Sequence, residues 1–326
     1  MKTLLKNKKA LGIVIAAALA LVAAVVFLLV RGSNGFRSIQ IYRLDGTAEV
    51  RRGEREFSPY VNMALTSGDH VATHEESYLY LKMDGDKFML AEPLTRFSLT
   101  ATGTRQDSRT VIDLEIGAVT SHLTEPLSEN SSYEVTTPNS TMAVRGTSFR
   151  VYVWYDEDGI SHTLLMVFEG TVACRLIYPD GTMSGERLFT EGQWASIWGS
   201  SETSDYDGWG DDIDYLSLDI PTLQFLKIGI RDLSRYNITM RRVNEIIKLK
   251  LSFFDVRFMV GEQLFGTQRI QYEHFAAEPS LRPTQYGRWD YDFETPILED
   301  TEIQWLYWTQ QPQSDDGGAQ STTDEP

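Results

Sequence analysis

The residues that could do chemistry in this 326-residue chain do not form a known catalytic or cofactor-binding pattern. His70 and His74 have the four-residue spacing of a metal pair on a helix. Their segment has strand character, however, and four residues of a strand span about 13 Å, too far for one ion. No H-E-x-x-H, G-x-S-x-G, Walker or G-x-G-x-x-G sequence is present. We therefore expect that the protein is not an enzyme and binds no cofactor.

An acidic segment, residues 200–219, holds a weak candidate for a metal site. Asp205, Asp207 and Asp211 partly follow the spacing of an EF-hand calcium loop, which ends in a glutamate at its twelfth position. Counted from Asp205, that position is Leu216. The main interpretation is a solvated acidic linker over 200–219, and a weak calcium site is the alternative.

The N-terminal region predicts a membrane anchor. Residues 10–30 carry no charge and are long enough to cross a hydrocarbon core of about 30 Å as a helix. Residues 1–9 contain lysines and no acid, which predicts a cytosolic N-terminus and an extracytoplasmic remainder. A cleaved signal peptide is the alternative, but its apolar region would be about 7–15 residues long. The expectation is an uncleaved, single-pass protein of the cell membrane.

The overall charge and the cysteine content restrict the environment. A net charge of −16 argues against nucleic acid as a partner of the whole chain. Cys174 is the only cysteine, so an internal disulfide is impossible. An extracytoplasmic chain without disulfides suits the surface of a Gram-positive bacterium better than a disulfide-rich secretory compartment.

Two β domains and a helical connector follow the predicted span. Residues 37–199 show short alternating runs separated by turn signals, which predicts a β-sandwich or roll. Residues 221–251 change to helical spacing, begin with a proline, and contain seven basic and two acidic residues from 222 onward. Residues 253–309 return to a strand pattern, and the polar residues 310–326 predict a disordered tail.

The basic connector has two interpretations. Its helices pack on a β domain with their cations toward the acidic segment, or they contact an anionic envelope polymer, lipid headgroups or the groove of a partner.

The segment 137–153 is the most specific part of the sequence. It reads T-P-N-S-T-M-A-V-R-G-T-S-F-R-V-Y-V and predicts a strand, a tight turn at Gly146 and a second strand. Four further elements precede or follow it in order: L-x-x-G-D-x-V-x-T at 65–73, a turn at 82–87, V-x-x-G-x-V at 167–172, and a closing G-Q after 188–191. Together these elements resemble the FecR domain, the extracytoplasmic module of iron-dicitrate-type membrane sensors.

The residues that carry this resemblance are expected to be structural, because glycines suit strand reversals with positive φ. Arg145 needs partners if it is buried, and a role in contacting a ligand is the alternative. The motif residues are Gly68, Asp69, Thr73, Arg145, Gly146, Thr147, Phe149, Gly170 and Gly192.

A second resemblance concerns the C-terminal β region. Its closing run from Trp289 to Trp308 includes W-D-Y-D-F-E-T-P-I and is similar to the end of the internalin-type B repeat, also called the Listeria–Bacteroides repeat. That resemblance implies one small β-grasp-like module.

These observations lead to a non-catalytic, membrane-anchored binding or scaffolding protein of a bacterial envelope. Its expected partner is an envelope protein or a wall polysaccharide. The alternative is FecR-type transmembrane signal transduction through sigma-factor regulation. Signalling is the less favoured expectation, since residues 1–9 are too few to build a sigma-binding domain.

Overall fold

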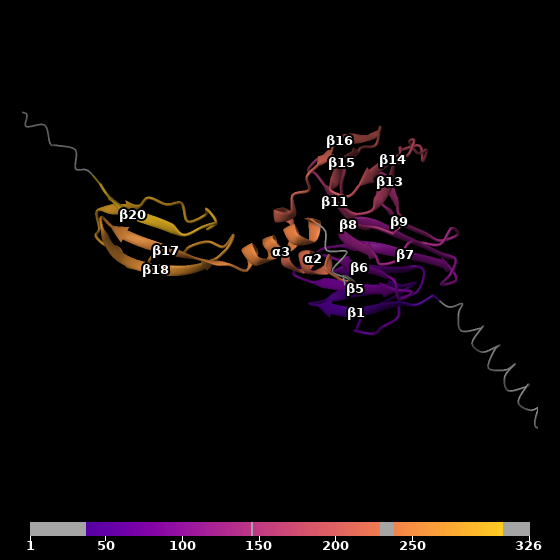
Figure 1. The fold of residues 1–326 in the computed structure, drawn as a ribbon, viewed down its shortest axis with the longest axis horizontal. Coiled ribbons are helices and arrows are strands. Elements are labelled where there is room, and N and C mark those ends of the chain that lie inside the picture. Colours follow the sequence, from indigo (N-terminus) through magenta and orange to yellow (C-terminus); the bar gives the residue numbers. More distant parts are fainter. Residues whose placement is uncertain (1–36, 145, 229–237, 309–326) are drawn as a thin grey trace, which may run out of the picture. The chain divides into compact units, whose positions relative to one another are not determined.

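The computed structural model describes residues 37–144, 146–228 and 238–308, and the fold is mainly β, as predicted. The chain divides into two compact units between Val243 and Asn244 (Figure 1). No helix among the described residues is long and apolar enough to cross a bilayer. The predicted span 10–30, the cytosolic segment 1–9, Arg145 and the tail 310–326 lie outside those residues.

Eight strands of the first unit form one antiparallel sheet, here called sheet A. In spatial order these are β1 (Ile39–Asp45), β5 (Tyr78–Met83), β6 (Lys87–Ala91), β8 (Ser108–Leu123), β11 (Ser148–Tyr155), β12 (Ser161–Glu169), β15 (Gln193–Gly199) and β16 (Ser204–Asp211).

A second sheet, sheet B, contains nine strands and shares β8 with sheet A. All its neighbouring strands are antiparallel except β8 and β9. In spatial order these are β3 (Arg55–Phe57), β2 (Ala48–Arg52), β4 (Asp69–Thr73), β7 (Arg96–Gly103), β8, β9 (Ser132–Thr136), β10 (Ser140–Val144), β13 (Thr171–Leu176) and β14 (Arg187–Thr190).

Strand β8 passes from one sheet to the other at Gly117. Up to Ile116 it pairs with β7 of sheet B, and from Gly117 onward it pairs with β11 of sheet A. Gly117 has a φ of +87°, and a Cβ there would lie 2.5 Å from the Cα of Thr95. A side chain would therefore meet both backbone strain and a clash with rigid backbone, so glycine is required where the strand turns.

The two sheets enclose one hydrophobic core. Phe149, Val151 and Val153 of β11 are fully buried, which is the alternation that the sequence predicts for this strand. The ring of Phe149 packs edge-on against Tyr133 of β9, at a centroid distance of 6.4 Å. Burial of this apolar surface is the main stabilising contribution to the unit.

The acidic segment 200–219 differs from its expected form. Residues Ser204–Asp211 are not a linker but strand β16, which pairs with β15 at the edge of sheet A. Exposure alternates along β16, and its three aspartates occupy exposed positions. The carboxylates are thus solvated without the segment being unfolded, because a strand leaves alternate side chains in water.

Among the described residues after β16 there are three helical segments: η2 (Tyr215–Ser217), α2 (Ile220–Phe225) and α3 (Ile238–Lys250). Asp219 caps α2, since its Oδ1 accepts a hydrogen bond from the Thr222 amide at 2.8 Å, and Pro221 occupies the first turn. Residues 229–237 of the expected connector lie outside the described residues.

Helix α2 packs on the outer face of sheet A. Phe225 is buried against Tyr80 and Leu90, with ring centroids of Phe225 and Tyr80 6.1 Å apart. Asp219 adds a polar contact to the same face, because its Oδ2 accepts a hydrogen bond from the Tyr78 hydroxyl at 2.6 Å. One carboxylate therefore both caps the helix and joins it to the sheet.

The second unit contains a four-stranded sheet in the order β18 (Gln263–Gln271), β17 (Phe253–Val260), β20 (Thr301–Tyr307), β19 (Gly287–Trp289). Strands β17 and β20 are parallel, and the other pairs are antiparallel. Trp289 and Trp305 are buried and pack edge-to-face at 5.1 Å. Asp290 follows Trp289 and accepts a hydrogen bond from the Gln304 amide at 2.6 Å, which ties the start of the W-D run to β20. The B-repeat resemblance stays a prediction.

Candidate functional site

Asp69, one of the motif residues at 65–73, forms an ion pair with Arg52, whose side chain is 42% exposed. Asp69 is fully buried at the start of β4, and its two oxygens each accept a 2.7 Å hydrogen bond from Arg52. The amide of Thr66 donates to Asp69 as well, at 2.8 Å. Burial alone would raise the pKa of Asp69, but the bonds from Arg52 and Thr66 outweigh burial and hold that pKa below its ordinary value. This carboxylate is fully occupied within the fold.

The T-P-N-S part of the signature forms a buried polar network. The Asn139 amide nitrogen donates to the carbonyl of Ser161 at 3.0 Å. Its Oδ1 accepts from the hydroxyls of Thr137, Ser140 and Thr163 at 3.1, 3.0 and 2.8 Å. Because buried polar groups are costly unless paired, this network explains how three polar residues, Thr137, Asn139 and Ser140, can be buried.

The motif glycines lie at turns, as the sequence predicts. Gly68, Gly146, Gly170 and Gly192 all have φ between +77° and +91°. A Cβ on Gly170 would lie 2.6 Å from the Cγ2 of Thr147. The Thr147 hydroxyl is buried with no hydrogen-bond partner among the described residues. The part of Thr147 that faces Gly170 is its methyl group.

The remaining motif side chains have structural surroundings where the structure describes them. The Thr73 hydroxyl donates to the Glu92 carbonyl at 2.6 Å and accepts from the Thr95 amide at 2.9 Å. Phe149 belongs to the core. Arg145 lies outside the described residues, so both interpretations of it stay predictions.

The calcium candidate is not assembled. Asp205, Asp207 and Asp211 are on one extended strand, so Asp205 and Asp211 are separated by about 20 Å of chain. Asp211 accepts a hydrogen bond from the Gln193 side chain at 2.9 Å. Over residues 37–144, 146–228 and 238–308, no group of three potential ligands comes together.

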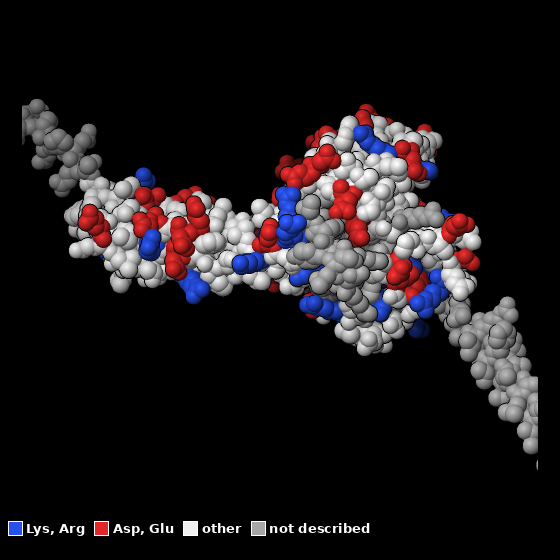
Figure 2. Space-filling view, in the orientation of Figure 1, with Lys and Arg blue, Asp and Glu red and all other residues white. Residues whose placement is uncertain are grey.

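Charge alone does not mark a binding surface on the visible face. On the face drawn in Figure 2, acidic side chains occur on both units with basic ones among them. Sequence reasoning also missed a buried pair on sheet A, in which Arg150 donates two 2.7 Å hydrogen bonds to Glu92. Both side chains are nearly buried, and α2 lies on the same sheet face, so the pair is part of the packing.

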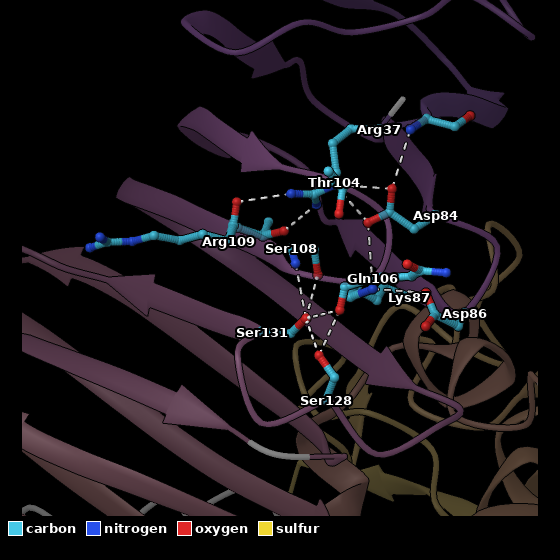
Figure 3. Close-up of polar contacts among 12 residues, drawn as sticks. Arg37, Asp84, Asp86, Lys87, Thr104, Gln106, Ser108, Arg109, Ser128 and Ser131 are labelled. Atoms are coloured by element: carbon cyan, nitrogen blue, oxygen red, sulfur yellow. Dashed lines mark hydrogen bonds and ion pairs between the residues drawn. The ribbon is translucent and has the colours of Figure 1, made fainter. Parts of the chain in front are cut away.

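The most distinctive cluster of charges is at the turn between β5 and β6 (Figure 3). Asp84 is fully buried there and has a φ of +54°, and Gly85 follows with a φ of +92°. Asp84 binds Arg37, which precedes β1, through 3.0 and 2.8 Å hydrogen bonds from Nε to both carboxylate oxygens. The Ser38 amide also donates to Asp84, at 3.2 Å. The turn thus holds the start of the described chain.

Lys87 completes this cluster. It is 2% exposed, and its Nζ lies 2.9 Å from Asp86 and 3.5 Å from Asp84. Two cations and two carboxylates therefore balance in a largely buried site, which is the condition for burying such charges at tolerable cost.

A hollow of about 250 Å³ lies beside Lys87. Its hydroxyl lining is already paired, because Ser128 and Ser131 donate to the Gln106 carbonyl at 2.7 and 3.1 Å. Ser131 also accepts from the Ser108 amide at 2.9 Å (Figure 3). The paired groups of this cluster fix the loop and bind Arg37, and they form no arrangement typical of a catalytic site.

Sequence reasoning placed a family turn at 82–87 but singled out neither Asp84 nor Arg37. The available signal was the Asp-Gly pair in that turn. Its partner lies 47 residues away in the chain, so no local pattern connects the two.

Comparison with known proteins identifies one domain within the larger unit. The family model described as FecR protein matches residues 69–173. Residues 69–173 are a FecR domain. The match includes the Asp84 turn and the signature at 137–153, and it confirms the FecR part of the resemblance.

Other comparisons add little to this domain assignment. No curated protein matches the chain. Two crystal structures of a candidate anti-sigma factor from Parabacteroides distasonis ATCC 8503 are each 12% identical in sequence to this chain. The aligned regions cover 75% and 74% of this chain, and 98% and 99% of the two matched chains. Their TM-scores are 0.32 and 0.36, too low to support an argument about this chain.

The FecR domain corrects the expected function. The sequence favours a binding or scaffolding role over signalling, and this expectation is wrong, because the domain shown at 69–173 is the one on which the signalling alternative depends. Signalling is disfavoured from the sequence because residues 1–9 are too few to build a sigma-binding domain. Where a sequence begins is no measure of what the cytosolic side can bind.

Proposed function

We propose that this protein transmits a signal across the cell membrane through its FecR domain to a transcription regulator of the sigma-factor class. The FecR match over residues 69–173 carries this proposal. The buried motif residues give the domain a rigid two-sheet frame, which suits a module that passes on a mechanical or binding event. The two-sheet unit is proposed to be a β-sandwich or roll.

The proposed topology follows from the sequence. Residues 10–30 span the membrane, residues 1–9 face the cytosol, and both β units are extracytoplasmic. The absence of disulfides favours a Gram-positive cell. The described chain begins at Arg37, seven residues after the predicted span ends, so the folded unit that contains the FecR domain begins close to the span in sequence.

The proposed input is extracytoplasmic. An envelope protein or a wall polysaccharide binds the outer units, and nucleic acid does not. The second unit is proposed to be a B-repeat-like module with a β-grasp-like fold, supported by the W-D run and its tie to β20. Its place after the FecR domain makes it a candidate for the ligand-binding part.

The proposal is tested by transcript profiling of cells that express the full chain or a chain without residues 69–173. The intact chain should change the transcripts of one sigma factor's gene set, and the shortened chain, inserted at equal abundance, should not. In-cell cross-linking from the lysines of residues 1–9 should recover a sigma factor or its regulator. Identical transcript profiles for the two chains, with no cytosolic regulator cross-linked, would refute the proposal.

A further inference from the structure

We infer that Arg37 is the positioning residue that couples the membrane-proximal chain to the FecR domain, and that releasing it from Asp84 changes the transmitted signal. This inference rests on the proposed function. It adds a residue and a contact through which the outer domain acts on the segment leading to the membrane.

Arg37 is bound by three separate parts of the FecR-containing unit. Its Nε donates to both oxygens of Asp84, at 3.0 and 2.8 Å. One terminal nitrogen donates to the carbonyls of Thr102 and Arg109, at 2.7 and 3.0 Å. The other donates to the Thr110 hydroxyl at 2.6 Å. Figure 3 shows the side chain of Arg37 with Asp84 and Arg109.

These contacts are specific to a guanidinium. Thr102 of β7 and Arg109 of β8 are direct partners in the ladder, so Arg37 joins the two carbonyls at that end of the strand pair. Only a planar fork with several N–H groups can address a carboxylate, two carbonyls and a hydroxyl at once. Lysine would keep the charge and lose most of these bonds.

The ion pair of Arg37 with Asp84 is also buried. The side chains of Arg37 and Asp84 are 8% and 0% exposed. If Arg37 leaves, Asp84 retains Lys87 at 3.5 Å but loses its short bonds, and water has little access to replace them.

The position of Arg37 gives this pair its role. Residues 31–36 separate it from the predicted span, and six residues reach about 20 Å at most. A displacement of the span therefore reaches the folded domain first at Arg37 and Ser38, both of which are bound to Asp84. In the opposite direction, a change at the Asp84 turn reaches the membrane-proximal segment through the same bonds.

The test uses full-length protein in cells, with Arg37→Lys as the probe and Arg52→Lys as the matched control. Arg52 also makes short bonds to a fully buried aspartate of the same domain, Asp69, but its own side chain is 42% exposed and makes no bond to Asp84. Arg37→Lys and Asp84→Asn should both shift the sigma-dependent transcripts at least about threefold in the same direction. Arg52→Lys, compared at equal abundance, should leave them unchanged.

A second readout measures directly whether residue 37 is released from Asp84. Trypsin cleaves after both arginine and lysine, so position 37 remains a cleavage site in Arg37→Lys. In membranes containing the full chain, cleavage after residue 37 should be about tenfold faster in Arg37→Lys than in the wild type or Arg52→Lys, since cleavage requires local opening. Unchanged cleavage in Arg37→Lys would show that the side chain does not hold this segment and would overturn the inference.

The outcomes separate this inference from the proposed function. If removal of residues 69–173 changes the transcripts and Arg37→Lys does not, the inference is wrong and the proposed function stands. Equal transcript shifts in Arg37→Lys and Arg52→Lys would also overturn it, because general loss of stability would then explain both. If removal of residues 69–173 has no effect on transcripts, the proposed function fails, and the inference fails with it.

Discussion

Replacing Asn139 with alanine should destabilise the FecR-containing unit by about 3 kcal/mol. The side chain is fully buried, donates hydrogen bonds to the carbonyl and the hydroxyl of Ser161, and accepts three from other hydroxyls. Thr137, Ser140 and Thr163 can still bond to one another, at 2.8 and 3.2 Å, so not every bond is lost. Two net bonds at about 1 kcal/mol each, and about 1 kcal/mol for the cavity, give this figure.

The loss should appear as a lower melting temperature for the larger unit. At about 2–4 °C per kcal/mol for a unit of this size, the expected shift is about 6–12 °C. Calorimetry of the purified protein measures it, and hydrogen exchange of the β10 amides assigns the transition to this unit. Asn130→Ala is the matched control, because Asn130 is exposed and its one side-chain bond among the described residues is a 3.4 Å bond to Asp107. Its shift should be within about 0.5 kcal/mol of zero.

A shift below about 1 kcal/mol in Asn139→Ala would refute the reasoning. It would mean that the hydroxyl groups satisfy themselves without the amide, and that the signature asparagine is not there for stability. Its occurrence in the FecR signature would then need a different explanation, such as contact with a ligand.

Three further predictions concern single contacts. Gly170→Ala should be about 1–3 kcal/mol more destabilising in thermal unfolding than Gly159→Ala. Both glycines have positive φ, but only at Gly170 would a Cβ clash with Thr147. Equal losses of stability in the two variants would contradict this. Asp69 has a pKa below its ordinary 3.8, so its stabilisation is present above that pH and lost as the pH falls below it. Asp69→Asn should therefore melt lower at neutral pH and lose less further stability than the wild type from pH 4 to 3; parallel curves would contradict this. Phe225→Ala should raise hydrogen exchange in α2 about tenfold or more, while the β5 amides stay protected; unchanged exchange would show that the ring does not hold the helix.

The sequence predicts what is periodic and local in this fold. The strand over 148–155 is recognisable because its apolar residues alternate, and Phe149, Val151 and Val153 are buried as expected. The motif glycines are recognisable because positive φ restricts the choice of residue. Both signals depend on neighbouring residues alone.

Features that depend on distant residues were not predictable in this way. Strand β8 is 16 residues long and belongs to both sheets, but its bend at Gly117 depends on Thr95, which approaches from another strand connection. The Arg37–Asp84 pair joins residues 47 positions apart. A single sequence contains each of these residues but no measure of which of them meet.

Strand β16 shows how composition can conceal a strand. Its aspartates and glycines suggested a solvated linker, but each residue type has a different reason to be there. The ring of Trp194 lies over Gly208 and Gly210, and a Cβ at these positions would come within 3.5 and 3.3 Å of it. The glycines therefore make room for a packed indole rather than supplying flexibility. The aspartates are exposed on an edge strand, where charge disfavours pairing with another chain. Acidity and glycine content are thus consistent with an ordered edge, and the same extended geometry keeps Asp205, Asp207 and Asp211 from surrounding one ion.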